Sequence, residues 1–453
     1  MIQKNQRLHL RCERLGSELE GVCMHEGMAV FVPGVLPGEE AGVLCVKAQP
    51  RYAFGKLLEV DVPSPDRVTP PCPVYDQCGG CSGQHMRYEA TLEAKRAQVF
   101  DCLTRIGGLA LAQQDVPPVL GARDPWHCRN KTALPVGGSW DRPELGFYRR
   151  RSHAIVPIES CLVAMPGLDG VISAVREWIT AARVQPYDER TGRGLLRHVV
   201  VRVTRGGSLM AVLAAARDAL PEIPLLVRLL TQRAPGFCSL HLSVNAGRNN
   251  VILGRSSRLL YGQEAVYETL LGLTFEIPPL SFFQVNPAQT ERLYQTAIDF
   301  AALSPSDTVV DAYAGAGTIS LCMARHAGRV IGIEIVPQAV EGAWRNARRN
   351  QITNAQFHAA AVETLLPRLV KDGLRPDVVV LDPPRKGVEP AVVEAVLAAR
   401  PRRVVYVSCH VPTQARDLQL LCQGGYRFER CQPVDMFCYA SGVENIVSLV
   451  LEN

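Results

Sequence analysis

The chain has 453 residues, of which 47% are hydrophobic and 21% charged. At roughly 150 residues per domain this length allows about three domains, and the composition excludes a disordered chain, a collagen-like repeat and a coiled coil. No run approaches the ~18 apolar residues of a membrane helix, and the first residues lack the apolar stretch of a signal peptide, so we expect a cytoplasmic protein. Lys and Arg outnumber Asp and Glu by 49 to 44, a net charge of +5 that indicates no particular partner by itself.

The amino-terminal segment, residues 8–62, alternates short apolar strands with glycine and proline. About five strands joined by tight turns predict a small β-barrel of the OB type. Residues 63–73 contain five prolines and form a stiff connector. From Arg87 to Ile106 the spacing of apolar residues predicts an amphipathic helix.

The middle of the chain, residues 125–275, predicts an α+β segment, with helices around 168–183 and 223–232 and strands around 198–204 and 251–255. Seven basic residues lie between Arg123 and Arg151, with Trp126, Trp140, Phe147 and Tyr148 among them. Basic groups neutralise phosphates and aromatic faces stack on bases, so this mixture favours RNA binding. The alternative is a solvated loop surface with its rings turned inward.

From about residue 290 helices and apolar strands alternate. We expect helices over 290–302, 318–327, 337–350 and 390–399, and strands over 308–311, 329–334, 377–382 and 403–408. Repeated strand–helix units predict an α/β fold with a parallel, doubly wound sheet. In such sheets the ligand lies beyond the carboxyl ends of the strands.

The first of these strand ends opens a glycine-rich turn that runs from Asp311 to Thr318. Its glycines let the backbone approach a ligand, but Ser320 stands where a dinucleotide fingerprint has its third glycine. Asp311 suits a cationic ligand better than a pyrophosphate, and Glu334 is placed to accept both ribose hydroxyls. These residues favour S-adenosylmethionine over a nicotinamide cofactor, and the alternative is a tight turn in an unrelated α/β domain.

Another strand end carries Asp382-Pro383-Pro384-Arg385. Enzymes that methylate exocyclic amines have a similar Pro-Pro pair followed by an aromatic residue that stacks on the base. Arg385 takes that place here, which leaves carbon as the expected methyl acceptor.

Cys409 follows the next strand, and Glu444 begins the last one. The C5 atom of uracil is too weak a nucleophile to attack a methyl sulfonium. A thiolate that adds to C6 places negative charge on C5, and after methyl transfer a base must remove the C5 proton. We therefore expect Cys409 to be the nucleophile and Glu444 the base; the alternatives are a structural cysteine and a surface glutamate.

Three cysteines, Cys72, Cys78 and Cys81, lie within ten residues beside prolines and glycines. A zinc ribbon usually shows two Cys-x-x-Cys pairs, and only one is present, although His85 is near. A [4Fe–4S] cluster accepts a distant fourth thiolate, for which Cys161 is preferred and Cys128 is the alternative. An iron–sulfur cluster, a zinc ion and no metal all remain open at this point.

Taken together, these residues resemble the RNA uracil-5-methyltransferase family, in particular its 23S ribosomal RNA branch. The segments from Gly27 to Gly34 and from Leu36 to Glu39 are similar to a TRAM domain, an OB-type RNA-binding barrel. The resemblance implies a [4Fe–4S] cluster on Cys72, Cys78, Cys81 and Cys161. It implies S-adenosyl-L-methionine binding by Gln284, Tyr313, Glu334 and Asp382. It implies Cys409 as nucleophile and Glu444 as proton acceptor.

The sequence departs from the family pattern at three places. His410-Val411 follow the cysteine where the family has Asn-Pro, Cys438 replaces a proline, and Gly442 replaces a histidine before Val443-Glu444. All three lie near the expected target base, so they bear on substrate choice more than on chemistry.

We expect three domains: a TRAM barrel over 1–62, a central iron–sulfur and RNA-binding α+β domain over 63–275, and a methyltransferase domain over 276–453. Helix 88–106 is expected to pack with the catalytic domain. The expected activity is formation of 5-methyluridine in 23S ribosomal RNA by a monomer without a membrane or protein partner. The alternatives are a tRNA uracil-5-methyltransferase, a nucleobase N-methyltransferase, and an RNA-binding iron–sulfur protein without activity.

Overall fold

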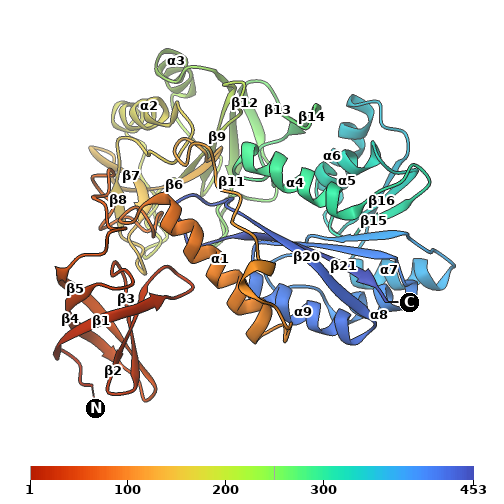
Figure 1. The fold of residues 1–453 in the computed structure, drawn as a ribbon. Coiled ribbons are helices and arrows are strands. Elements are labelled where there is room, and N and C mark those ends of the chain that lie inside the picture. The colour runs from red at the N-terminus through yellow and green to blue at the C-terminus, as the bar shows by residue number, and fades with distance from the viewer. Residues whose placement is uncertain (1, 249, 453) are drawn as a thin grey trace.

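The computed structural model describes residues 2–248 and 250–452. A small barrel, a seven-stranded sheet, a two-stranded hairpin and a second seven-stranded sheet follow one another along the chain (Figure 1). Within the described ranges, no helix has the length and apolar character needed to cross a bilayer.

The amino-terminal barrel confirms the expected five-stranded closed structure. Its strands are joined in the order β1-β2-β3-β5-β4. Alternate residues of the first strand, such as Leu8, Leu10 and Cys12, are buried in the barrel core, as the two-residue period of a half-buried strand requires. The strands are β1 (Arg7–Leu15), β2 (Gly21–His25), β3 (Met28–Val32), β4 (Glu40–Ala48) and β5 (Tyr52–Val62).

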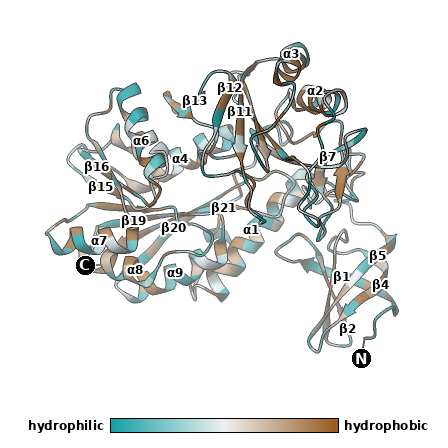
Figure 2. Cartoon of the chain, turned by 180° about the vertical axis from the view of Figure 1, so that it is seen from behind, coloured by the Kyte–Doolittle hydropathy of each residue, from teal (hydrophilic) through white to brown (hydrophobic). Residues whose placement is uncertain are grey.

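The central sheet has the order β12-β11-β10-β9-β6-β7-β8. Helices α2 (Leu168–Ala181) and α3 (Ile223–Arg233) pack on it and carry both hydrophobic and hydrophilic residues (Figure 2), as expected for helices with one buried side. The strands are β6 (Lys131–Ser139), β7 (Arg142–Tyr148), β8 (Ile155–Pro157), β9 (Leu196–Val203), β10 (Leu209–Ala215), β11 (Phe237–Val244) and β12 (Arg258–Gly262).

The strand predicted at residues 251–255 is wrong. Those residues form a loop, and the next strand is β12. This strand pairs antiparallel with β11 at one edge of the sheet, and most of its residues are exposed. Pairing with β11 therefore determines that β12 is the strand, although the apolar run on which the prediction rested, residues 251–253, lies just before it.

The carboxyl-terminal sheet has the order β17-β16-β15-β18-β19-β21-β20. The five strands from β17 to β19 are parallel, and β21 runs antiparallel to both of its neighbours. The direction of winding reverses at β15, which is where ligands bind in doubly wound sheets. The strands are β15 (Thr308–Asp311), β16 (Arg329–Glu334), β17 (Ala355–Ala359), β18 (Val378–Leu381), β19 (Arg403–Ser408), β20 (Tyr426–Val434) and β21 (Glu444–Leu451).

Helices cover both faces of this sheet (Figure 1). Successive strand residues face opposite sides, so Val309 packs in one core and Val310 in the other. One face holds α4 (Pro287–Ala301), α5 (Thr318–Ala324) and α6 (Pro337–Arg349). The other face holds α1 (Tyr88–Arg105), α7 (Val362–Lys371), α8 (Pro390–Ala399) and α9 (Val411–Gln423).

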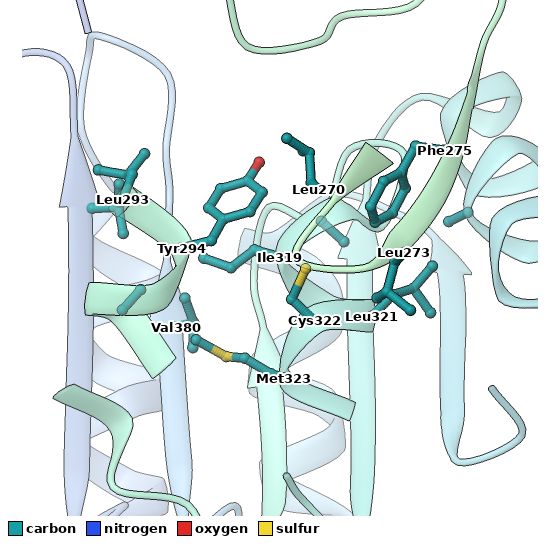
Figure 3. Packing of buried hydrophobic residues seen from close by; sticks show 14 of the residues in the cluster. Leu270, Leu273, Phe275, Leu293, Tyr294, Ile319, Leu321, Cys322, Met323 and Val380 are labelled. Carbon is teal, nitrogen blue, oxygen red and sulfur yellow. The ribbon is translucent and has the colours of Figure 1, made fainter. Parts of the chain in front are cut away.

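A two-stranded hairpin, β13 (Val266–Leu270) and β14 (Leu273–Ile277), packs on the same core as α4 and α5. Figure 3 shows Leu270, Leu273 and Phe275 of the hairpin among side chains of these two helices. Tyr294 of α4 is buried there, and its hydroxyl lies 2.7 Å from the Thr318 hydroxyl. The hairpin therefore extends the core of the carboxyl-terminal domain.

Helix α1 joins the barrel to the carboxyl-terminal domain. Its residues Val99 and Leu103 pack in the core of the carboxyl-terminal domain. At its amino-terminal end, Met86 packs with Leu19 and Leu36 of the barrel segment. A short 3₁₀ turn, η1 (Gln113–Asp115), follows the helix and leads toward the central sheet.

Candidate active site

Four predicted site residues lie at the carboxyl ends of parallel strands in the carboxyl-terminal sheet. Glu334 ends β16, and Asp382 and Cys409 directly follow β18 and β19. Asp311 ends β15 between them. Because these strands are parallel neighbours, their ends meet at one edge, and the four side chains share the position where doubly wound sheets bind ligands.

The turn after β15 brings its backbone close to the neighbouring strand. Gly317 precedes α5 with φ +78°, and a Cβ there would lie 2.9 Å from the Ala343 Cβ, so glycine is required at this position. The backbone N–H of Gly315 donates to Glu334 Oε2 at 3.0 Å, and that of Val336 donates to Oε1 at 2.8 Å. Two backbone groups thus fix the Glu334 carboxylate, which leaves its remaining lone pairs free to accept hydrogen bonds from a ligand.

Two buried acids lie beside this turn. Asp311 accepts hydrogen bonds from the Ser320 hydroxyl and, at 3.4 Å, from the Tyr313 N–H. Burial raises the pKa of Asp311 to about 6 and that of Asp382 to about 7, and the Asp311 charge adds to the second shift. Burial penalises the charged form of each carboxyl. A cationic ligand between them would offset this cost, whereas a phosphate would increase it.

Cys409 and Glu444 lie opposite each other on neighbouring strands. Strands β19 and β21 pair antiparallel up to Ser408 and Asn445. Cys409, which follows Ser408, and Glu444, which precedes Asn445, continue that register. Residues opposite each other in an antiparallel pair have Cβ atoms about 4.5–5.5 Å apart. The pairing therefore places a thiol and a carboxyl beside each other at the ligand edge.

Arg385 completes this thiol–carboxyl pair. Burial raises the pKa of Cys409, and the Glu444 charge adds to this effect, whereas a hydrogen bond from Arg385 lowers that pKa. Burial likewise raises the pKa of Glu444 to about 8. Glu444 is 3% exposed, and its Oε2 atom has no hydrogen-bond partner among the described residues. Sequence reasoning noted where Arg385 lies but missed its contact with the thiol.

Gln284 lies in the loop before α4 and is 8% exposed. Asn130, just before β6, donates through Nδ2 to Gln284 O at 2.9 Å and through its backbone N–H to Val285 O at 2.8 Å. These bonds attach the loop to the central sheet. Phe282, two residues earlier, is 72% exposed, and sequence reasoning did not single out this ring.

The segment between β20 and Glu444 is held by a buried ion pair. Lys95 of α1 and Asp435 are both fully buried, with 2.5 Å between Nζ and Oδ1, and Lys95 also donates to Phe437 O at 3.0 Å. The Tyr88 hydroxyl donates to Asp435 Oδ2 at 2.5 Å. The backbone N–H groups of Ser82 and Gly83 both donate to the carbonyl of residue 439, so the cysteine-rich segment also contacts this loop.

The predicted cluster cysteines gather in one place. Cys81 is buried with Tyr75 and Val163 in a small apolar cluster, and Cys72 and Cys161 pack against it. Cys78 lies close enough to Cys161 and Cys72 for their charges to add to the burial that raises its pKa. Among the described residues, no group of three or more His, Cys, Asp or Glu side chains is arranged to hold a metal ion.

Two family models match parts of this chain. Residues 245–452 match the tRNA (uracil-5-)-methyltransferase family, and residues 3–58 match the TRAM domain. An uncharacterized RNA methyltransferase of Halalkalibacterium halodurans is 42% identical over 453 residues, which is all of this chain and 98% of that protein. An uncharacterized RNA methyltransferase of Clostridium tetani is 41% identical over 98% of this chain and 96% of its own length.

A solved structure is similar over the whole fold. The tRNA (uracil-54, C5)-methyltransferase of Pyrococcus abyssi, in complex with S-adenosyl-L-homocysteine, has a TM-score of 0.80 and 26% identity. The match covers 98% of this chain and all of that one. The barrel, the class I methyltransferase sheet and these matches show that this chain belongs to the RNA uracil-5-methyltransferase family, which uses S-adenosylmethionine to methylate C5 of uracil in RNA.

Proposed function

We propose that this protein makes 5-methyluridine in 23S ribosomal RNA through a covalent adduct between Cys409 and C6 of the target uracil. The observation that carries the proposal is the strand pairing that sets Cys409 opposite Glu444, at the edge that also holds Glu334 and Asp382. The thiol and the carboxyl that we propose as nucleophile and base therefore lie next to the residues proposed to hold the methyl donor. The target uracil would be flipped out of the RNA to reach this edge.

Cys409 begins the reaction. After its thiol has lost its proton to solvent, the thiolate adds to C6, and the electrons of the C5–C6 double bond move to make an enolate with negative charge on C5. Arg385 favours the thiolate through the hydrogen bond that lowers the Cys409 pKa. Without this hydrogen bond, burial and the Glu444 charge would leave more of the cysteine as the unreactive thiol.

Glu444 ends the reaction. Bound S-adenosylmethionine supplies the methyl group that C5 accepts. The Glu444 carboxylate then takes the proton from C5, the electrons of that C–H bond restore the double bond, and Cys409 leaves as a thiolate. The raised Glu444 pKa of about 8 makes this carboxylate a stronger base than an exposed glutamate.

The proposed cofactor residues are Gln284, Tyr313, Glu334 and Asp382. The fixed carboxylate of Glu334 is suited to two ribose hydroxyls, because both of its oxygens are already oriented by backbone N–H groups. The buried carboxyls of Asp382 and Asp311 are suited to the positive charges of a sulfonium and an ammonium group. These acidic groups fit S-adenosylmethionine better than a dinucleotide.

We also propose that Cys72, Cys78, Cys81 and Cys161 hold a [4Fe–4S] cluster. The shared apolar surroundings of Cys72, Cys81 and Cys161 support the proposal, as do Arg129 beside Cys81 and Cys161 and Arg150 beside Cys78, because these cations offset thiolate charge. The cluster would join the segment before α1 to the segment before α2.

This part of the proposal is tested with anaerobically purified protein. We expect about four iron atoms and four sulfides for each chain. Cys161→Ser should lose the iron, whereas Cys238→Ser, a control cysteine on β11, should keep it. Iron-free wild-type protein would contradict the assignment.

Ribosomal RNA is proposed as the substrate because the family resemblance joins a TRAM domain and a cysteine cluster in the 23S ribosomal RNA branch. The reaction would take place in the cytoplasm, where ribosomal RNA is made. Transfer RNA is the second candidate, since the similar Pyrococcus abyssi enzyme is named for tRNA and its structure covers this chain from the barrel onward. The barrel alone therefore does not decide between the two RNAs.

Methyl transfer from labelled S-adenosylmethionine tests the proposal. Unmodified 23S ribosomal RNA and unmodified tRNA are offered in parallel, and the products are digested to nucleosides. We expect labelled 5-methyluridine from ribosomal RNA only. Label from tRNA alone would overturn the substrate, and label on a base amine would overturn the chemistry.

A further inference from the structure

Three aromatic side chains form a group on the outside of the barrel. Phe31 of β3 pairs with Phe54 of β5, and Tyr52 lies two residues before Phe54 on the same face. The ring centroids are 5.6–6.0 Å apart. Val30 and Ala53, which alternate with these residues, fill the barrel core, so the three rings face away from it. Tyr52 is 40% exposed.

Three consecutive arginines of the central domain lie next to this group. Arg149, Arg150 and Arg151 form the turn between β7 and β8. The Arg151 guanidinium lies 5.3 Å from the centroid of the Phe54 ring, which brings the turn against the barrel. A cavity of about 500 Å³ lies between this turn and the backbone of Gly79 and Gly80.

The Arg149–Arg151 turn is strongly basic. Arg149 donates to Gln77 Oε1 at 3.0 Å, Arg150 donates to Cys81 O and lies over the Tyr75 ring, and Arg151 lies over Phe54. In the described part of the chain, none of the three forms an ion pair with a carboxylate. The nearby Glu189 contacts Tyr148 and His153 instead.

We propose that the rings of Phe31, Tyr52 and Phe54 and the Arg149–Arg151 turn form one binding surface for unpaired nucleotides of the RNA substrate. Aromatic faces stack on exposed bases, and guanidinium groups contact phosphates and stack on rings. A duplex offers phosphates but no free base faces, so the rings favour single-stranded RNA. The surface joins the barrel to the central domain, so RNA bound there would contact both. This inference rests on the proposed RNA substrate and specifies which part of it the barrel binds.

Affinity for a short unpaired RNA oligonucleotide, measured by fluorescence anisotropy without S-adenosylmethionine, tests the surface. Stacking of one base is worth about 1–3 kcal/mol, so we expect Tyr52→Ala to weaken binding about 5- to 160-fold. Tyr261→Ala is the matched control, because Tyr261 is 42% exposed and stacks on Phe237 at the far edge of the central sheet. Equal affinities of the two variants would overturn the proposal.

The arginines are tested by the dependence of binding on salt. Arg149→Ala should lower the slope of log affinity against log salt by about 1, since one phosphate contact is lost. Arg183→Ala is the control for Arg151→Ala. Arg183 has the same left-handed backbone, and its guanidinium also lies over an aromatic ring, 5.2 Å from the centroid of Trp140. Arg151→Lys should keep the salt slope even if removing the side chain loosens the barrel. Unchanged slopes in Arg149→Ala and Arg151→Ala would refute the phosphate contacts.

Annealing the oligonucleotide to its complement separates the two parts of the idea. We expect the duplex to bind the wild type more weakly and to be insensitive to Tyr52→Ala. A duplex that binds as tightly as the single strand would overturn the preference for unpaired nucleotides. These binding assays involve no methyl transfer. They can therefore confirm the RNA-binding surface even if the proposed activity is wrong, and they can refute the surface even if the activity is right.

Discussion

The buried pair of Lys95 and Asp435 should contribute strongly to stability. Both side chains are 0% exposed, and 2.5 Å separates Nζ from Oδ1. Lys95→Met leaves the Asp435 carboxylate buried, with the Tyr88 hydroxyl as its remaining side-chain partner. Removal of one member of a buried pair costs about 3–5 kcal/mol, a large part of the total stability of a domain, about 5–15 kcal/mol.

Lys386→Met is the matched control for this prediction. Lys386 and Glu389 are also 2.5 Å apart, but their side chains are 66% and 43% exposed, so solvent screens their attraction and the loss of this pair should change stability little. Midpoints of urea unfolding give the free energies of both variants. The double variant Lys95→Met/Asp435→Asn should recover most of the loss, because no unpaired charge stays buried.

If Lys95→Met were no more destabilising than Lys386→Met, the buried pair would not have the strong effect on stability that its burial predicts. Asp435 begins the loop that leads to Glu444, and the Lys95 ammonium group also donates to Phe437 O. Amide exchange in residues 435–443 should therefore be faster in Lys95→Met than in the control.

Three further predictions concern the site. Glu444→Gln should accumulate a protein–RNA adduct, seen as a slow band on a denaturing gel. In the wild type, the release of product should speed up as the pH rises through about 8, where the Glu444 carboxyl loses its proton. A release rate that does not depend on pH would exclude Glu444 as the base. Burial raises the pKa of Asp311 from 3.8 to about 6 and of Asp382 from 3.8 to about 7, so these carboxyls hold protons in the folded protein that the unfolded chain has released, and they lower the unfolding free energy of the cofactor-free protein as the pH rises from about 4 to 7. The buried imidazoles of His85 and His198, with pKa values lowered to about 4, act in the opposite direction. Asp382→Asn removes one carboxyl and no imidazole, so its urea midpoint should fall less, or rise more, with pH than that of the wild type, and identical pH profiles would contradict the raised values. Arg385→Gln should slow alkylation of Cys409 by iodoacetamide at pH 8, because the thiolate loses its hydrogen-bond donor, and an unchanged rate would remove Arg385 from the mechanism.

Much of the carboxyl-terminal fold could be predicted because its parallel strands are buried on both faces. Strands β15, β16, β18 and β19 are continuous apolar runs, which carry a clear signal. Strand β17, with the sequence AQFHA, was missed because it is a half-exposed edge strand. Helix α7 was missed as well, and it contains Pro367, which is unfavourable inside a helix.

The site could be predicted only as far as residue types and strand ends allow. Cys409 and Glu444 were chosen for their chemistry, but their opposition depends on the antiparallel register of β19 and β21, which the sequence does not encode locally. The Lys95–Asp435 pair joins residues 340 positions apart, and the aromatic group on the barrel depends on the parallel pairing of β3 with β5. Such contacts arise from tertiary packing, so no local sequence pattern predicts them.

Trapping of the covalent intermediate tests the central claim most directly. RNA that carries 5-fluorouridine at the target position has no C5 proton for Glu444 to remove, so elimination cannot follow methyl transfer. With S-adenosylmethionine present, we predict a stable adduct in which digestion and mass spectrometry place the RNA on Cys409, and its loss in Cys409→Ala. An adduct on another cysteine, or full turnover of RNA by Cys409→Ala, would contradict the account.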